Sequence, residues 1–266
     1  MARLRAEDAA KRRESGNGPD FLEALSRGLK VIRAFGPDRP QMTLSDVARA
    51  TDLPKPSVRR ALHTLTCLGY VATDGRVFRL TPGVMTLASA YLGSNMMTTI
   101  VQPACKRISD RTDQSCFAAV LDGHDIVMIA HSMPRNLIEL GPSMGMRRPA
   151  FCTAAGRAIL SGLSDEALDG WLDRLEPKRV TEFTVTDKKA LRQAILEVRR
   201  VGYSITEQEV RRGYRAVAFP LRRYDGTVVA ALCVAAWIED GADMTQPDAH
   251  VAALREETEA LQRQLV

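Results

Sequence analysis

Hydrophobic positions in the first part of the chain recur at helical spacing. Four apolar residues, three or four positions apart, form one stripe: Leu22, Leu25, Leu29 and Ile32. This spacing predicts an amphipathic helix, which Gly36-Pro37 ends. Before it, residues 1–20 contain Lys11-Arg12-Arg13 and a run rich in Ser, Gly and Pro, which predicts a flexible basic tail.

Two short helices joined by a tight turn are predicted next. Thr43, with Asp46 three positions later, fits the capping box that begins a helix, and Asp52 suits a left-handed turn position. A second helix begins near Pro56 and ends at Gly69. Its apolar stripe has helical spacing: Val58, Ala61, Leu62, Leu65 and Leu68. This arrangement is a helix-turn-helix.

A β-hairpin is predicted directly after the second helix. The stretches Tyr70–Thr73 and Arg76–Leu80 flank Asp74-Gly75, a pair that is preferred in two-residue hairpin turns. Helix, turn, helix and hairpin together make a winged helix-turn-helix over residues 21–81.

Residues 82–95 are predicted to form a linker helix, because Pro82 suits its first position and Gly93 its end. From residue 96 onward the pattern is an α+β mixture. Apolar stretches predict the strands Ser115–Leu121, Ile126–His131, Leu137–Leu140, Tyr203–Thr206, Ala216–Leu221 and Val228–Ala236. Helical spacing predicts the helices Val101–Arg111, Ala154–Leu163, Asp165–Leu172, Lys188–Val201 and Asp248–Gln264. This order favours an antiparallel sheet covered by helices.

Basic residues are concentrated in the first third of the chain. The protein has 266 residues and a net charge of +5. Residues 1–95 carry 15 Lys and Arg against 9 Asp and Glu, whereas residues 96–266 carry 22 against 23. This asymmetry predicts that the N-terminal part contacts a polyanion and that the larger part does not.

The second helix of the motif carries polar side chains opposite its apolar stripe. Such a helix donates hydrogen bonds to phosphates and to base edges in the major groove, and a hairpin beside it reaches the flanking backbone or minor groove. We therefore predict that double-stranded DNA is contacted by seven residues of the helix and the hairpin: Lys55, Ser57, Arg59, Arg60, His63, Arg76 and Arg79.

Candidates for catalysis are few. The stretch Gly141–Gly145 matches the G-x-S-x-G nucleophile elbow of serine hydrolases, with Ser143 at its centre. That elbow needs a helix directly after the serine, and Gly145 and Pro149 disfavour one. The four histidines lack metal-ligand spacing, and no glycine-rich phosphate-binding motif occurs. We therefore expect no catalytic residue, no metal and no cofactor.

The five cysteines include no C-x-x-C pair, and Cys152 and Cys233 lie in apolar stretches that predict core or pocket lining. The N-terminus has no apolar segment of a secretory signal, and no apolar run approaches the length of a membrane span. These features are typical of a reduced, cytoplasmic protein that does not enter a membrane.

Several stretches resemble the IclR family of bacterial transcriptional regulators. In the N-terminal part they are Leu25–Leu29, Leu44–Ala48, Leu53-Pro54, Leu68–Val71 and Phe78–Pro82. In the C-terminal part they are Cys152–Ala158, Gly202–Ile205, Glu209, Gly213 and Ala216–Leu221. The sequence Cys-Thr-x-x-Gly-Arg is most similar to the branch that controls protocatechuate and 4-hydroxybenzoate catabolism, the beta-ketoadipate pathway.

The resemblance implies a homodimer, or a dimer of dimers, that binds an operator near a catabolic promoter. It also implies a GAF-like effector-binding domain over residues 96–266. Its cavity would hold a small organic acid and be lined by nine residues: Leu137, Arg148, Ala154, Ala155, Thr206, Tyr214, Ala216, Cys233 and Ala235.

Some family members have more polar residues at the positions of Thr206, Cys233 and Ala235, so a flat aromatic acid is expected here. 4-Hydroxybenzoate and protocatechuate are the leading candidates. Arg148, or its neighbour Arg147, would pair with the carboxylate.

The sequence thus predicts a ligand-responsive transcriptional regulator that is not an enzyme. Two alternatives stay open: a serine hydrolase that uses Ser143, and a DNA-binding protein that does not respond to a ligand.

Overall fold

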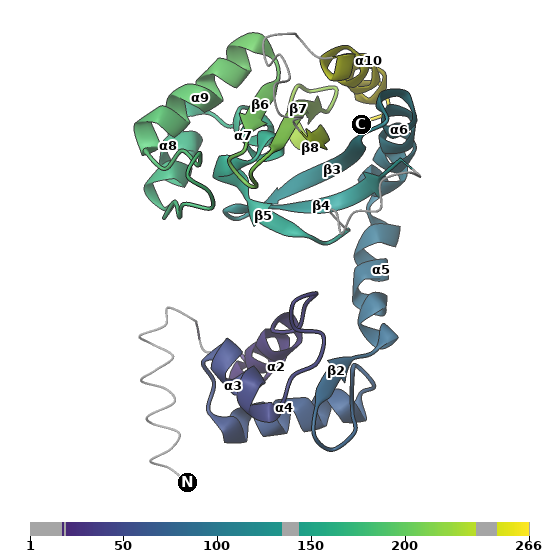
Figure 1. The fold of residues 1–266 in the computed structure, drawn as a ribbon, viewed down its shortest axis with the longest axis vertical. Helices are drawn as coiled ribbons and strands as arrows, with labels where there is room; N and C mark the ends of the chain where they lie inside the picture. Colours follow the sequence, from purple (N-terminus) through teal and green to yellow (C-terminus); the bar gives the residue numbers. More distant parts are fainter. Residues whose placement is uncertain (1–17, 19, 135–143, 238–248, 266) are drawn as a thin grey trace. The chain divides into compact units, whose positions relative to one another are not determined.

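The computed structural model describes residues 18, 20–134, 144–237 and 249–265 (Figure 1). Contacts within the chain divide it into two units, Met1–Ala90 and Tyr91–Val266. Among the described residues, no helix has both the length and the apolar character needed to cross a membrane.

A helix-turn-helix and a β-hairpin form the N-terminal unit. The helices are α2 (Glu23–Arg33), α3 (Leu44–Thr51) and α4 (Lys55–Cys67), and the hairpin pairs β1 (Val71–Thr73) with β2 (Phe78–Leu80). Buried apolar side chains from the three helices and β1 meet in one small core, against which partly buried side chains of β2 pack. Among the buried residues are Val31, Val47, Val58, Leu62 and Val71. The predicted winged helix-turn-helix is confirmed.

The capping box and the turn of this motif are formed as the sequence predicts. The Thr43 hydroxyl accepts a hydrogen bond from the Asp46 amide at 3.3 Å, and the Asp46 carboxylate accepts one from the Thr43 amide at 3.1 Å. Hydrogen bonds from Thr43 lower the pKa of Asp46. Asp52 ends α3 in the left-handed conformation, with φ 52° and ψ 39°. These local contacts turn the chain from α3 into α4.

The apolar stripe of α2 is only partly covered within this unit. The helix forms, but Leu22, Leu25 and Leu29 are all exposed. Val31 is buried in the core shared with α4, and Ile32, the last residue of the stripe, packs partly buried against that core. Because the periodicity of a single helix does not reveal which of its faces the fold covers, the leucine stripe is left at the surface of this unit.

The hairpin turn is also longer than predicted. Thr73 pairs with Phe78, so that four residues, 74–77, connect the strands instead of two. The Asp74 carboxylate accepts hydrogen bonds from the amides of Arg76 and Val77, both at 2.9 Å, which lower the pKa of Asp74. Gly75 has φ +92°. Asp74 thus organises the loop through its side chain, which is why the Asp-Gly pair is present without a two-residue turn.

The C-terminal unit is built on an antiparallel sheet, which confirms the predicted α+β class. Its strands are β3 (Ser115–Asp122), β4 (Asp125–Ser132), β5 (Arg147–Pro149), β6 (Ser204–Glu207), β7 (Tyr214–Arg222) and β8 (Val228–Trp237). Their order across the sheet is β5-β4-β3-β8-β7-β6, and each neighbouring pair is antiparallel.

Helices cover both faces of this sheet (Figure 1). On one face lie α6 (Met96–Thr112) and α10 (Ala249–Gln262), and on the other α7 (Ala154–Leu160), α8 (Asp165–Asp173) and α9 (Lys188–Val201). Alternate residues of β8 face opposite ways: Leu232 and Val234 pack toward α6 and α10, whereas Cys233 packs toward α7. The sheet therefore has two separate apolar cores.

Two predicted helices differ in the structure and one predicted strand is not tested. The expected strand Leu137–Leu140 lies outside the described residues. The sheet has an edge strand that was not predicted, β5, which pairs with β4. Helix α6 begins at Met96 and continues through Pro103, earlier than expected. The expected linker helix is preceded by a 3-10 turn, η1 (Pro82–Val84), so that α5 spans Met85–Ser94; none of its residues is buried.

A close approach between two backbone segments fixes the start of α7. A 3-10 turn, η2 (Ala150–Cys152), precedes the helix and passes directly under Gly156. A β-carbon at Gly156 would lie 2.1 Å from the carbonyl oxygen of Ala150. Glycine is required here by space, because a backbone carbonyl cannot rotate away as a side chain can.

We predict that Gly156→Ala destabilises the protein by about 1–3 kcal/mol or more, because the helix and η2 must separate to admit the methyl group. The matched control is Gly170→Ala in α8, where the nearest atom to a new β-carbon is the Arg174 guanidinium nitrogen at 3.6 Å. That change should stabilise by about 0.5–1 kcal/mol through helix propensity. Urea unfolding of the two variants measures both effects, and an unchanged midpoint for Gly156→Ala would contradict the spatial argument.

Candidate functional site

The exposed face of α4 carries most of the predicted DNA-contacting residues. Val58, Leu62 and Leu65 are buried against the core, which turns the other side of the helix to solvent. On that side, four predicted residues are exposed: Lys55, Arg59, Arg60 and His63. Ser57 is half-buried.

The charges of this face are not neutralised within the described residues. No carboxylate there pairs with Lys55, Arg59 or Arg60, whereas Arg49 of α3 pairs with Asp46 at 3.3 Å. Helix α4 itself contains no acidic residue. Arg76 and Arg79 are exposed on the hairpin. The helix and hairpin thus present basic groups that are available to a polyanion.

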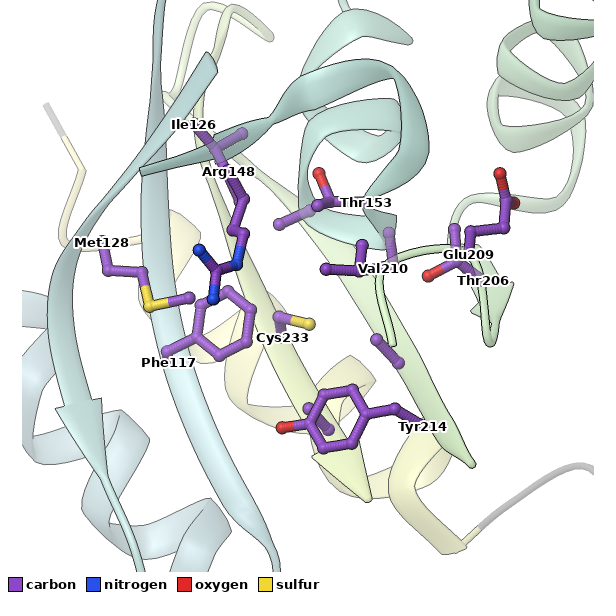
Figure 2. Close-up of a pocket in the computed structure, with 14 residues that line it drawn as sticks. Phe117, Ile126, Met128, Arg148, Thr153, Thr206, Glu209, Val210, Tyr214 and Cys233 are labelled. Carbon is purple, nitrogen blue, oxygen red and sulfur yellow. The ribbon is translucent and has the colours of Figure 1, made fainter. Parts of the chain in front are cut away.

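A cavity opens between the sheet and the start of α7 in the C-terminal unit. Strands of the sheet form its floor, and Thr153 with the first residues of α7 forms the opposite wall (Figure 2). Arg148 of β5, Thr206 of β6 and residues 209–210 complete the lining. Its lining is mostly apolar, with small side chains on β7, β8 and α7. Small residues at these positions leave space where larger side chains would fill the core.

Eight of the nine residues predicted from the resemblance line this cavity: Arg148, Ala154, Ala155, Thr206, Tyr214, Ala216, Cys233 and Ala235. The ninth, Leu137, lies outside the described residues. Six further lining residues were not predicted: Phe117, Ile126, Met128, Thr153, Glu209 and Val210. The alternation of β3 and β4 could have indicated Phe117 and Met128, because they face the same side of the sheet as Cys233.

The two neighbouring arginines of β5 have different surroundings. Arg147 donates hydrogen bonds to the carboxylates of Asp122 at 2.6 Å and Asp125 at 3.1 Å, and the Asp122 contact raises the pKa of Arg147. Arg148 lines the cavity, and Figure 2 shows its guanidinium directed toward the space beside Phe117. Among the described residues no carboxylate pairs with Arg148. Arg148 is therefore the arginine of the cavity.

Two opposite charges are buried at the cavity wall. The side chains of Arg157 and Glu209 are 6% and 7% exposed, and a guanidinium nitrogen lies 2.7 Å from each carboxylate oxygen. Arg157 also donates to the Phe151 carbonyl at 2.9 Å, and Glu209 accepts from the Val185 amide at 3.1 Å. The pair joins η2 and α7 to the segment that carries Glu209, and it neutralises the one acidic residue among those that line the cavity.

Cys233, which lines the cavity, and the buried Cys152 do not have the lowered thiol pKa that thiolate chemistry requires. Burial raises the pKa of Cys152 to about 12 and raises that of Cys233 well above its usual range. Both thiols stay protonated at neutral pH, so they act as small apolar groups.

The structure after Ser143 contradicts a nucleophile elbow. Residues 141–143 lie outside the described residues, but Met144 and Gly145 form a turn that leads into β5 and not into a helix. An elbow requires a helix at this point. No group of three or more His, Cys, Asp or Glu side chains in the described part of the chain could hold a metal ion.

Comparison with known proteins identifies the family. Residues 24–75 match the IclR helix-turn-helix domain, and residues 89–263 match the C-terminal region of bacterial IclR transcriptional regulators. The chain belongs to the IclR family. The resemblance drawn from the sequence motifs is thereby confirmed, and the regulators of this family are not enzymes.

Two curated relatives are regulators by name. The Pca regulon regulatory protein of Pseudomonas putida is 40% identical over 227 residues, which cover 85% of this chain and 78% of the relative. The p-hydroxybenzoate hydroxylase transcriptional activator of Acinetobacter baylyi is 32% identical over 218 residues, 80% of each chain.

Solved structures share the fold. A transcriptional regulator from Rhodococcus sp. RHA1 has a TM-score of 0.79 at 37% identity, over 92% of this chain and 98% of its own. An IclR homologue from Microbacterium hydrocarbonoxydans, complexed with 4-hydroxybenzoate, has a TM-score of 0.75 at 24% identity, over 91% of this chain and 99% of its own. At that identity the second likeness shows the fold alone.

We predict that Arg157→Ala costs about 3–5 kcal/mol of unfolding free energy, because it leaves the Glu209 carboxylate buried without a partner. Arg192→Ala is the matched control: Arg192 bonds Asp169 at 2.6 Å at the surface, where such a pair contributes about 0–1 kcal/mol. Chemical denaturation of both variants measures the difference. Equal losses would show that the buried pair is no more important than a surface pair.

Proposed function

We propose that this protein is a ligand-responsive, sequence-specific regulator of a catabolic operon, with a small aromatic carboxylic acid as its effector. Membership of the IclR family establishes a transcriptional regulator with a DNA-binding helix-turn-helix. The class of effector is inferred from one observation: Arg148 lines a cavity that is otherwise mostly apolar, and no carboxylate among the described residues pairs with it.

An anion fits this cavity for electrostatic reasons. Glu209 is neutralised by Arg157, so Arg148 leaves the lining with a net positive charge. A carboxylate enters an apolar cavity only when it is paired, and a guanidinium can pair with it through two hydrogen bonds. The apolar lining, which includes Phe117, suits an aromatic ring, and Tyr214 and Thr206 offer hydroxyl partners for a ring substituent. 4-Hydroxybenzoate and protocatechuate have this combination of groups.

For DNA, we propose contacts by Lys55, Ser57, Arg59, Arg60 and His63 from α4, and by Arg76 and Arg79 from the hairpin. A recognition helix of this type lies in the major groove, where arginine pairs with guanine through two hydrogen bonds. Since operator DNA is in the cytoplasm, we infer that the protein works there.

We further propose that the protein acts as a homodimer or a dimer of dimers on a palindromic operator. Leu22 directly before α2, Leu25 and Leu29 of α2, and Leu87 of α5 are exposed in the single chain. Apolar surface of this kind is stabilised when a second copy covers it. Effector binding then shifts the population between two states that differ in operator affinity.

We predict that the double variant Arg59→Ala/Arg60→Ala keeps its fold and loses about 1–3 kcal/mol of operator affinity for each base contact removed. The salt dependence of its operator affinity should fall if phosphate contacts are lost. Fluorescence anisotropy with a duplex selected from random sequences gives both values. The control is Arg200→Ala, which removes an exposed arginine of the other unit. Wild-type affinity in the double variant would exclude α4 as the reading helix.

We predict that Arg148→Ala weakens 4-hydroxybenzoate binding about ten- to hundredfold, the value of a charge-assisted hydrogen bond at a partly solvated guanidinium. Arg147→Ala removes the neighbouring charge outside the cavity and should leave the affinity unchanged. Calorimetry also compares the acid with 4-hydroxybenzamide, which cannot form an ion pair. Equal affinities for acid and amide would refute the carboxylate assignment, and a protein that binds no acid at all would favour the ligand-independent alternative.

A further inference from the structure

The loop between β6 and β7, residues 208–213, forms part of the wall of the cavity. Val210 of this loop lines the cavity (Figure 2). The loop is closed at its base: the Gln208 amide donates to the Tyr214 carbonyl at 2.7 Å, and the Gly213 amide donates to the side-chain oxygen of Gln208 at 3.0 Å. The loop is therefore a compact unit that carries Val210 as a whole.

Both ends of this loop have a left-handed backbone. Gln208 has φ +57° and Gly213 has φ +68°. Glycine adopts this conformation freely, whereas glutamine is strained in it and keeps it only when surrounding contacts hold it. Loops pivot at the few residues whose backbone angles can change. Gln208 and Gly213 are thus the two positions about which the loop can turn, and the strain at Gln208 favours the turn once its contacts are lost.

Two threonines hold the loop from outside the cavity. The Thr181 hydroxyl donates to the Gln208 carbonyl at 2.7 Å, and the Thr184 hydroxyl donates to the next carbonyl, that of Glu209, also at 2.7 Å. Thr184 is 3% exposed. Neither threonine is among the residues that line the cavity. We call Thr181 and Thr184 the threonine latch.

A turn over residues 181–184 fixes the two hydroxyls of the threonine latch. The amides of Val180 and Thr181 donate to the Thr184 hydroxyl oxygen at 3.1 and 2.8 Å, and the Phe183 amide donates to that of Thr181 at 3.2 Å. A hydroxyl has one proton to donate. Since each oxygen already accepts from a backbone amide, its proton is directed to the carbonyl of the loop.

A separate contact retains the rest of this wall when the threonine latch is open. The Glu209 carboxylate bonds Arg157 and the Val185 amide, and neither bond involves a threonine hydroxyl. Loss of the latch therefore frees the backbone beside Glu209, including Val210, while the ion pair still anchors the Glu209 side chain. The loop can open without unfolding of the unit.

We propose that the threonine latch controls how fast the effector enters and leaves the cavity. While the latch is closed it holds Val210 at the cavity wall, and when it opens the loop turns about Gln208 and Gly213 and admits the ligand. This inference rests on the proposed aromatic-acid effector. Thr181 and Thr184 are positioning residues, because they act on the ligand through the loop.

Stopped-flow mixing of the full-length protein with 4-hydroxybenzoate, followed by tryptophan fluorescence, measures both rate constants. Thr184→Val keeps the shape of the side chain and removes the hydroxyl. We expect the association and dissociation rates to rise together by about two- to tenfold, the equivalent of one net hydrogen bond, so that the affinity changes little. Thr181→Val has the same effect. A residue that merely supports the fold would not accelerate association.

Two further variants control for the chemistry of the change. Thr184→Ser keeps the hydroxyl and retains the wild-type rates. Thr112→Val removes a hydroxyl that donates to the Ile108 carbonyl at 2.8 Å in α6, on the other face of the sheet, and leaves both rates unchanged. Urea unfolding of each variant verifies that it is folded. A slower association in Thr184→Val, or equal effects of Thr184→Val and Thr112→Val, would overturn the proposal.

A double-mutant cycle tests whether the threonine latch acts through Val210. In a Val210→Ala background the side chain at the cavity wall is shorter, so opening of the loop removes a smaller obstacle. Thr184→Val then accelerates the two rates less than it does in the wild type. An equal acceleration in both backgrounds would show that Val210 is not the group that the latch positions.

Amide hydrogen exchange, followed by mass spectrometry, tests the threonine latch without a ligand. Thr184→Val speeds exchange in peptides that cover residues 208–213, and Thr112→Val does not. Faster exchange with wild-type ligand rates overturns the role of the latch in effector entry and leaves the proposed function intact. Wild-type protein that binds no 4-hydroxybenzoate overturns the proposed effector, and the role of the latch in its entry with it, whatever the exchange shows.

Discussion

Arg157 and Glu209 occupy a place in the core where neither charge is stable by itself. Burying an unpaired ion costs several kcal/mol, so the two side chains must approach each other from distant parts of the chain before this region can pack. Their contact brings the segment that carries Thr206 and Glu209 to the start of α7. The Phe151 carbonyl, which accepts from Arg157, fixes η2 under Gly156. The walls of the cavity are therefore held apart at a set distance by one ion pair and one backbone contact.

The cavity exists because the side chains between these walls are short. Strands β7 and β8 place Ala216, Cys233 and Ala235 on the same face, and α7 places Ala154 and Ala155 opposite them. On the other face of the same strands, Leu232, Val234 and Phe219 fill the space beneath α6 and α10. The alternation of the strands thus gives one tightly packed core and one that is partly empty. A ligand site forms on the face with the small residues.

Local signals in the sequence predicted most of the elements. The helix Lys188–Val201 has the predicted bounds, because Asp187 caps its start and Gly202, at φ +89°, ends it. Signals that depend on distant partners failed. β5 is three residues long and contains two arginines, so no apolar pattern indicates it; its pairing with β4 makes it a strand. The stripe of α2 predicted a helix correctly, but nothing in its spacing tells which face the fold covers.

For the candidate sites, too, the sequence predicted what local motifs determine and missed what depends on distant partners. The family motifs indicated the cavity residues, yet neither the motifs nor the spacing separates Arg148 from Arg147. The difference lies in Asp122 and Asp125, more than twenty positions earlier, which bind Arg147. Arg157 likewise finds its partner in Glu209, and Arg49 finds one in Asp46. An arginine whose charge is neutralised within the chain has less to gain from an anion outside it. Arg148, and Arg59 with Arg60 on α4, lack such a partner among the described residues, and these are the positions where an anion from outside the chain, a carboxylate or a phosphate, gains most by binding.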